Sequence, residues 1–143
     1  WDDAELDAQS EGGNLASILN SHERDCIIEM LSTTNLSNIW IGGSRPVGGE
    51  YFDWRWVGSS HTNTSWTYSD WVIDPVAIPS TSRACVRMSV QSSYGWIDSD
   101  CSLMAPYLIE FPFTKDISGF RCDPTGTRFK QIEINMRWSD ALE

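Results

Sequence analysis

The first 18 residues, WDDAELDAQSEGGNLASI, constrain the fold more than any other part of the chain. The apolar residues of this stretch fall on one face of a helix: Ala4, Ala8, Leu15 and Ile18. The pair Gly12-Gly13 is typical of a helix end, because glycine readily adopts the left-handed conformation of a C-cap. The pattern predicts an opening helix that ends at the glycine pair and packs one face on a core.

A second helix is predicted directly afterwards. In Asn20-Ser-His-Glu23, Asn20 or Ser21 can serve as the N-cap, and Glu23 can reach back to the start of the helix. Its expected buried stripe is Ile27, Ile28 and Leu31. We expect this helix to end before Thr33-Thr34.

The remainder of the first 113 residues has the patterns of strands and one long loop. The predicted strands are Asn38 to Gly43, Tyr51 to Trp56, Cys85 to Met88, Gly95 to Cys101 and Pro106 to Glu110. Residues 59–84 are rich in Ser, Thr, Asp and Pro and have few periodic apolar positions, so they predict a long irregular loop. Two helices followed by strands indicate an α+β domain.

These segments together resemble the C-type lectin-like domain family. The shared motifs are Trp-x-Asp-Ala and Gly-Gly-x-Leu-Ala-Ser-Ile in the opening stretch, Trp-Ile-Gly at 40–42, and the paired segments CVRM and GWIDSDC. The resemblance covers about residues 1–113, and the motifs recur in the family's order. It implies a C-type lectin-like fold, with two helices packed on mainly antiparallel sheets and a long loop region, and a function in extracellular recognition.

The resemblance also assigns roles to the cysteine positions. Cys85 and Cys101 stand where the family cross-links two strands, which implies a disulfide and a secreted or luminal setting. The family's other cross-link would join positions 8 and 109, where Ala8 and Ile109 imply ordinary core packing instead. Cys26 and Cys122 are left over. They pair with each other, within one chain or between neighbours, or Cys26 is a small buried hydrophobe and Cys122 is free or bonded to an absent segment.

Sugar-binding members of this family hold calcium with a long-loop Glu-Pro-Asn or Gln-Pro-Asp, a later Trp-Asn-Asp and a Glu just before the strand Cys. Calcium takes several oxygen ligands, and two sugar hydroxyls complete its shell. The corresponding places here carry Asp74-Pro-Val76, Trp96-Ile-Asp98 and Arg83. The valine and the isoleucine offer no side-chain oxygen, and a cation at Arg83 would repel the ion.

We therefore expect no cofactor, and no calcium held jointly by Asp74 and Asp98. On this interpretation Asp74 caps a turn and Asp98 bonds loop backbone. A different acidic set, such as Asp70 with Asp100, is the alternative. The aromatic loop residues Trp66, Tyr68 and Trp71 are the candidates for stacking on a sugar ligand.

The last 30 residues form the least expected part of the chain. Trp138, Asp140 and Ala141 repeat the spacing of Trp1, Asp3 and Ala4 at an offset of 138 − 1 = 137. The preceding segment, from Cys122 to Ile132, resembles the family's opening turn and first strand, which residues 1–113 lack. We expect residues 1–113 to be one domain, 114–119 a linker, and 120–143 the first strand and helix start of a following repeat. A chance match in an unrelated tail is the alternative.

An open sheet edge left by the missing strand needs a partner. Residues 127–134 alternate in a strand-like way, and we expect residues 120–143 to pack mainly on an adjoining copy. The competing arrangement is a compact monomer, in which this tail folds back as a permuted first strand.

Composition limits the partners. The formal net charge of −10 argues against nucleic acid and anionic membranes, and no apolar run approaches the roughly 20 residues of a membrane span. An enzyme is not expected, because His22 and His61 lack any zinc-like or nucleophile-base pattern. Asn35-Leu-Ser37 and Asn63-Thr-Ser65 have the form of glycosylation acceptors.

Three recognition functions remain. The first is a calcium-independent protein–protein or self-assembly module in a secreted tandem-repeat protein with an adhesive or structural role. The second is a carbohydrate-binding lectin with an altered long-loop site. The third is an ice-, mineral- or toxin-like specialised surface, by analogy of fold alone.

Overall fold

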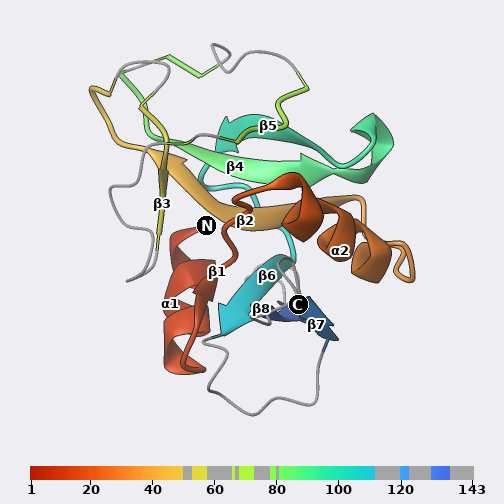
Figure 1. Ribbon diagram of the computed structural model, residues 1–143. Helices are drawn as coiled ribbons and strands as arrows, with labels where there is room; N and C mark the ends of the chain where they lie inside the picture. Colours follow the sequence, from red (N-terminus) through yellow and green to blue (C-terminus); the bar gives the residue numbers. More distant parts are fainter. Residues whose placement is uncertain are drawn as a thin grey trace.

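A computed structural model gives the fold of the chain (Figure 1). It describes residues 1–49, 53–57, 66, 68–72, 78–79, 81–111, 120–122 and 130–135, the last two ranges by their backbone alone.

Helix α1 (Asp2–Ser10) opens the chain, with Trp1 at its N-cap. Gly12 has a φ of 90° and donates its N–H to the Gln9 carbonyl at 3.0 Å. Gly13 donates to the Ala8 carbonyl at 2.9 Å. These two bonds form a Schellman motif, which satisfies the last helix carbonyls through a left-handed residue. The predicted glycine C-cap is confirmed.

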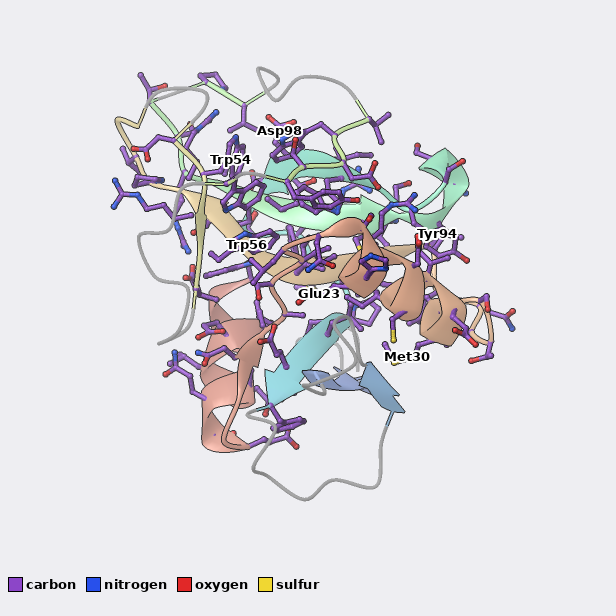
Figure 2. The ribbon with its side chains drawn as sticks, viewed as in Figure 1. Glu23, Met30, Trp54, Trp56, Tyr94 and Asp98 are labelled. Carbon is purple, nitrogen blue, oxygen red and sulfur yellow. A yellow bond between two sulfur atoms is a disulfide. The ribbon has the colours of Figure 1, made fainter. Side chains whose placement is uncertain are left out.

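Helix α2 (Ser21–Leu31) begins with a reciprocal cap. The Asn20 side chain accepts the Glu23 N–H at 2.9 Å, and the Glu23 carboxylate accepts the N–H of Leu19 at 3.0 Å. The cap prediction is confirmed, but the buried stripe is Ile27, Met30 and Leu31. Met30 replaces Ile28 in that stripe because residues three and four apart share a helix face (Figure 2).

The strands form one mixed sheet in the order β5–β4–β2–β6–β8–β7 (Figure 1). Their bounds are β1 (Asn14–Leu15), β2 (Asn38–Arg45), β3 (Arg55–Trp56), β4 (Ala84–Ser89), β5 (Gly95–Asp100), β6 (Tyr107–Phe111), β7 (Phe120–Cys122) and β8 (Lys130–Asn135), with a short 3-10 helix η1 (Val90–Ser92) after β4. All neighbours in this order pair antiparallel except β2 and β6, which run parallel. Short β1 pairs with β6, and β3 pairs with β2. Two helices on a mainly antiparallel sheet confirm the predicted α+β class.

Two hydrophobic clusters fill the space between helices and sheet. The first includes residues of α2, β2, β4 and β5, among them Ile27, Leu31, Ile39, Met88 and Trp96. The second includes Trp1 and residues of α1, β1, β2 and β6, among them Ala8, Leu15, Trp40 and Ile109. Together the clusters bury both faces of the central strands.

Ala8 and Ile109 are both fully buried in the second cluster. Ordinary packing therefore occupies the place that the resemblance assigned to a cross-link. Nearby, a Cβ atom on Gly13 would lie 2.5 Å from the carbonyl oxygen of Glu110. The end of α1 thus approaches β6 so closely that only glycine fits.

The tail returns to the sheet of its own chain. Strand β8 pairs with β6, with Ile134 opposite Leu108 and Ile132 opposite Glu110, and β7 pairs with β8. Strands β7 and β8 thus take the fold-back arrangement within one chain. A single chain does not test the prediction that residues 120–143 pack mainly on an adjoining copy. Donation of the strand to a neighbour in an array stays a prediction. Residues 112–119, 123–129 and 136–143, which include the whole expected linker and the repeated helix start, lie outside the described residues.

Candidate functional site

The disulfide between Cys85 and Cys101 ties β4 to the turn after β5, as the resemblance implied. Cys26 is disulfide-bonded as well. Its helix, α2, contacts strand β7, which carries Cys122. The Cys122 side chain lies outside the described part of the structure, so its pairing with Cys26 stays a prediction.

Asp98 lies in the middle of β5, opposite Val86 of β4. Its side chain is nearly buried, and its Oδ2 accepts the backbone N–H of Ile78 at 3.1 Å. The carboxylate thus fixes the far end of the long loop, which matches the expectation that Asp98 bonds loop backbone. Asp74 and Asn63 lie outside the described residues.

Arg83, just before β4, turns toward the start of α1. Its guanidinium donates to the Asp2 carboxylate and lies over the Trp1 ring, 5.0 Å from the ring centroid. The hydrogen bond from Arg83 lowers the pKa of the Asp2 carboxyl below its ordinary value of 3.8. A positive charge, paired within the chain, therefore occupies the position where sugar-binding members of the family carry a Glu for calcium.

A surface pocket of about 510 Å³ lies between the start of α1, residues 78–79 and 82–83, and the end of β5. Its polar lining comes from Asp2, Ser82, Arg83, Asp100 and Ser102, and Ile78 and Pro79 form an apolar wall. Carboxylates and hydroxyls beside one guanidinium can exchange hydrogen bonds with a ligand that carries hydroxyl or basic groups. The polar lining makes this pocket the candidate recognition site.

The alternative acids Asp70 and Asp100 are not brought together as one site. Asp100 Oδ1 accepts the Ser102 N–H at 2.8 Å and its hydroxyl at 2.7 Å, and these bonds lower the pKa of Asp100. Asp70 forms an ion pair with Arg24 of α2 instead. Asp100 therefore faces the pocket as an ionised carboxylate, while Asp70 attaches the long loop to a helix.

The aromatic loop residues gather around Trp96, which is fully buried. Trp66 stacks on Trp56 at 4.1 Å between ring centroids and on Trp71 at 5.7 Å. Tyr68 meets Trp96 edge-on at 5.9 Å. These rings contact one another and the core cluster below them, so their main contribution is packing. Apart from Ala84, which begins β4, a single bridge between Trp71 and Trp96 is the only strand-like pairing among the described residues of the predicted loop.

Arg45, at the end of β2, is a functional candidate that sequence reasoning missed. It is fully buried, its Nη2 donates to the carbonyls of Ile78 and Pro79, and its guanidinium lies 5.3 Å from the Trp54 ring centroid. Arginine beside a proline at a strand end is usually exposed. No spacing or motif in the sequence separated it from the other arginines.

Comparison with known families decides the identity of this architecture. The profile of the Lectin C-type domain matches residues 1–111. The chain belongs to the C-type lectin domain family.

Several proteins with C-type lectin domains are similar in sequence. The chain is 34% identical over 122 residues to regenerating islet-derived protein 3-beta of Mus musculus, covering 78% of this chain and 65% of that protein. It is 31% identical over 102 residues to the type-2 ice-structuring protein of Osmerus mordax, covering 71% and 54%. The chain thus spans less than two thirds of these relatives. It is also 32% identical over 110 residues to C-type mannose receptor 2 of Homo sapiens, covering 76% of this chain and 7% of the receptor.

A solved structure of human lithostathine superposes with a TM-score of 0.60 at 27% identity, covering 78% of this chain and 82% of that one. This similarity confirms the predicted C-type lectin-like fold.

Within this C-type lectin domain, the described residues at the calcium positions fit calcium poorly. Asp98 is the one carboxylate among them, and it already accepts a backbone N–H, while Arg83 contributes a positive charge. Across the described residues, no group of three or more His, Cys, Asp or Glu side chains is arranged to hold a metal ion. In the same part of the chain, no helix has both the length and the apolar character that a membrane crossing requires.

Proposed function

We propose that this chain is an extracellular, calcium-independent C-type lectin-like recognition module. One observation carries the proposal: the Oδ2 of Asp98, the one carboxylate described at the calcium positions, accepts the Ile78 N–H, so loop backbone takes up part of its capacity to bind a cation. The Arg83–Asp2 pair supports it, because a guanidinium near the same strand end opposes a second cation.

The extracellular assignment rests on covalent chemistry and on relatives. The Cys85–Cys101 disulfide is a bond that persists in oxidising compartments. The family is one of binding domains, and we propose that this member has no enzymatic activity.

Protein–protein contact is the favoured mode of recognition. The candidate sugar-stacking rings contact one another. Within one chain β8 covers the β6 edge, and in an array the same strand can be exchanged between copies. The match to a small part of C-type mannose receptor 2 is an example of such a domain within a much longer chain. We propose that the parent protein is a tandem array with an adhesive or structural role, whose neighbouring copies contact one another.

Carbohydrate binding is the second candidate, and the pocket beside Asp2 and Asp100 favours it. Its carboxylates and hydroxyls suit a hydroxyl-rich ligand without any metal.

A glycan array, probed with and without chelator, separates the two candidates. Protein–protein recognition predicts no glycan signal in either condition, and two copies joined head to tail should contact one another equally in calcium and in chelator. Glycan signal that persists in chelator and falls on Asp100→Asn supports the pocket lectin. Signal that needs calcium overturns the proposal of calcium independence.

A further inference from the structure

The end of the long loop is held from two sides by buried groups of opposite charge. The Ile78 N–H donates to Asp98 of β5 at 3.1 Å, and the Ile78 carbonyl accepts from Arg45 of β2. The same Arg45 nitrogen donates to the Pro79 carbonyl at 3.1 Å. We name this set, formed by Arg45, Asp98 and the backbone of Ile78 and Pro79, the loop clamp.

Arg45 is unusual as a member of a protein core. It is 0% exposed, and its Nε and Nη1 have no hydrogen-bond partner within the described part of the chain. Nor do the described residues give it a carboxylate within ion-pairing distance. A buried charge is costly unless paired. The stabilisation that remains comes from the two carbonyls and the face of Trp54.

The loop clamp connects the strands to the candidate pocket. Arg45 ends β2 and Asp98 lies in β5, and both strands pair with β4, so the two groups have rigid supports. Ile78 and Pro79, which they hold, form the apolar wall of the pocket. The position of that wall therefore depends on a side chain that the pocket does not contain.

We propose that Arg45 takes the place of a bound cation in this domain. It is a positioning residue, whose positive charge orders the end of the long loop and fixes the pocket wall without a metal. Carbonyl oxygens at a loop end are ligands that a bound cation can also organise. Here a guanidinium attached to the strand organises them permanently. The inference deepens the proposed calcium-independent function and rests on it.

Amide exchange of Ile78, measured by NMR on the intact chain without ligand, tests the role of Arg45. In the wild type we expect equal protection of Ile78 in chelator and in millimolar calcium. Arg45→Met keeps an unbranched side chain but removes all donors, and should speed Ile78 exchange about ten- to hundredfold, since a bond from a charged donor is lost. The exchange rates of the β4 and β5 amides should change much less, because those strands remain paired.

Two further variants make the test specific. Arg45→Lys keeps the charge and can reach only part of the acceptor set, so it should raise Ile78 exchange by less than Arg45→Met. Arg55→Met removes an arginine that is half exposed on β3 and should leave Ile78 unchanged. If Arg45→Met does not fold, Arg45→Lys tests the proposal by itself. Its amide exchange rate should rise at Ile78 and change much less in β4 and β5.

Three results would overturn the proposal. The first is unchanged protection of the Ile78 amide in the Arg45 variants. The second is an exchange rate that rises equally at Ile78 and throughout β4 and β5. The third is protection of the Ile78 amide that appears only with calcium. Because no ligand is present, the loop clamp can fail while the pocket still binds. Conversely, the glycan and self-association assays can fail while Ile78 remains protected by Arg45.

Discussion

At the residue scale, the pocket is controlled by charges that are already paired within the chain. Arg83 is shared between the Asp2 carboxylate and the face of Trp1, and this attaches the start of α1 to the strand end before β4. Asp100 is ionised but bonded on one oxygen to Ser102. Asp100 is therefore the charged group of the pocket that is most available to a ligand.

The Arg83–Asp2 pair predicts a small, pH-dependent contribution to stability. The folded pKa of Asp2 is lowered below 3.8, so the contribution is complete above pH 3.8 and is lost as the pH falls through the lower folded pKa. Asp2 is 64% exposed, and solvent screening limits such pairs to at most about 1 kcal/mol. Asp2→Asn should lower the free energy of unfolding by up to that amount at pH 7 and by almost nothing near the acid end of the titration.

Urea unfolding at several pH values measures the effect of Asp2→Asn. Asp3→Asn, on the neighbouring exposed acid of the same helix turn, is the matched control for helix-dipole effects. A difference between wild type and Asp2→Asn that persists at low pH, or that Asp3→Asn reproduces, would count against the pair.

Asn35 is predicted to carry a glycan. It is exposed in the loop between α2 and β2, and Ser37 of its acceptor triplet is exposed as well. Expression through a eukaryotic secretory pathway should give a mass that falls by one glycan in both Asn35→Gln and Ser37→Ala, with little change in Tm. An unmodified Asn35 peptide in the wild type would contradict this assignment.

Residue roles were predictable from the sequence where they depend on neighbours along the chain or on aligned motifs. The cap at Asn20 is local, and the backbone bond of Asp98 was expected from the loss of the other calcium ligands around it. Arg45 was not predictable, because its burial depends on β2, β3 and the loop end meeting in space.

At the element scale, the two strands next to the pocket are joined both by hydrogen bonds and by a covalent bond. β4 and β5 pair along six residues each, and the Cys85–Cys101 disulfide closes the hairpin with a sequence separation of 16. Such a cross-link stabilises mainly by restricting the unfolded chain. The same bond holds the turn at Cys101 that borders the pocket.

Replacing both cysteines, Cys85→Ala with Cys101→Ala, should lower the free energy of unfolding by about 3 kcal/mol, the value expected for a loop of this size. Chemical denaturation with and without reducing agent measures it. The reductant should destabilise the wild type more than the double variant. Equal stability of wild type and double variant under oxidising conditions would show that the bond contributes little.

The elements themselves were largely predictable, because helices and strands have distinct apolar periods. The glycine pair at 12–13 and the strand around Trp40 both follow from local pattern. The strand that pairs with β8 was not predictable, since alternating apolar residues predict a strand but not the sheet edge that it joins. The repeat at Trp138 favoured a neighbour, whereas in the single chain β6 accepts the strand.

At the scale of the whole molecule, β8 completes the sheet by covering the β6 edge with hydrogen bonds. Within one chain this gives a closed unit, and within an array the same strand can pass to the next copy. The isolated chain should therefore be a monomer in which the amides of residues 130–135 are protected from exchange. Deleting residues 120–143 should expose β6 and favour association through that edge.

Sedimentation and amide exchange on the intact and truncated chains check this prediction. Dimers or filaments of the intact chain that disappear on truncation would show instead that the strand is donated to a neighbour. Unprotected amides at 130–135 in a monomer would contradict both arrangements.

Calcium calorimetry on the intact chain tests the central claim most directly, namely that this C-type lectin domain recognises its ligand without a metal. Asp98 is already bonded to Ile78, and Arg83 opposes a second cation, so we predict no saturable heat at calcium concentrations up to about the millimolar range of weak extracellular sites. The thermal unfolding midpoint should also be the same in calcium and in chelator. Binding tighter than about 1 mM that is lost on Asp98→Ala would contradict the account.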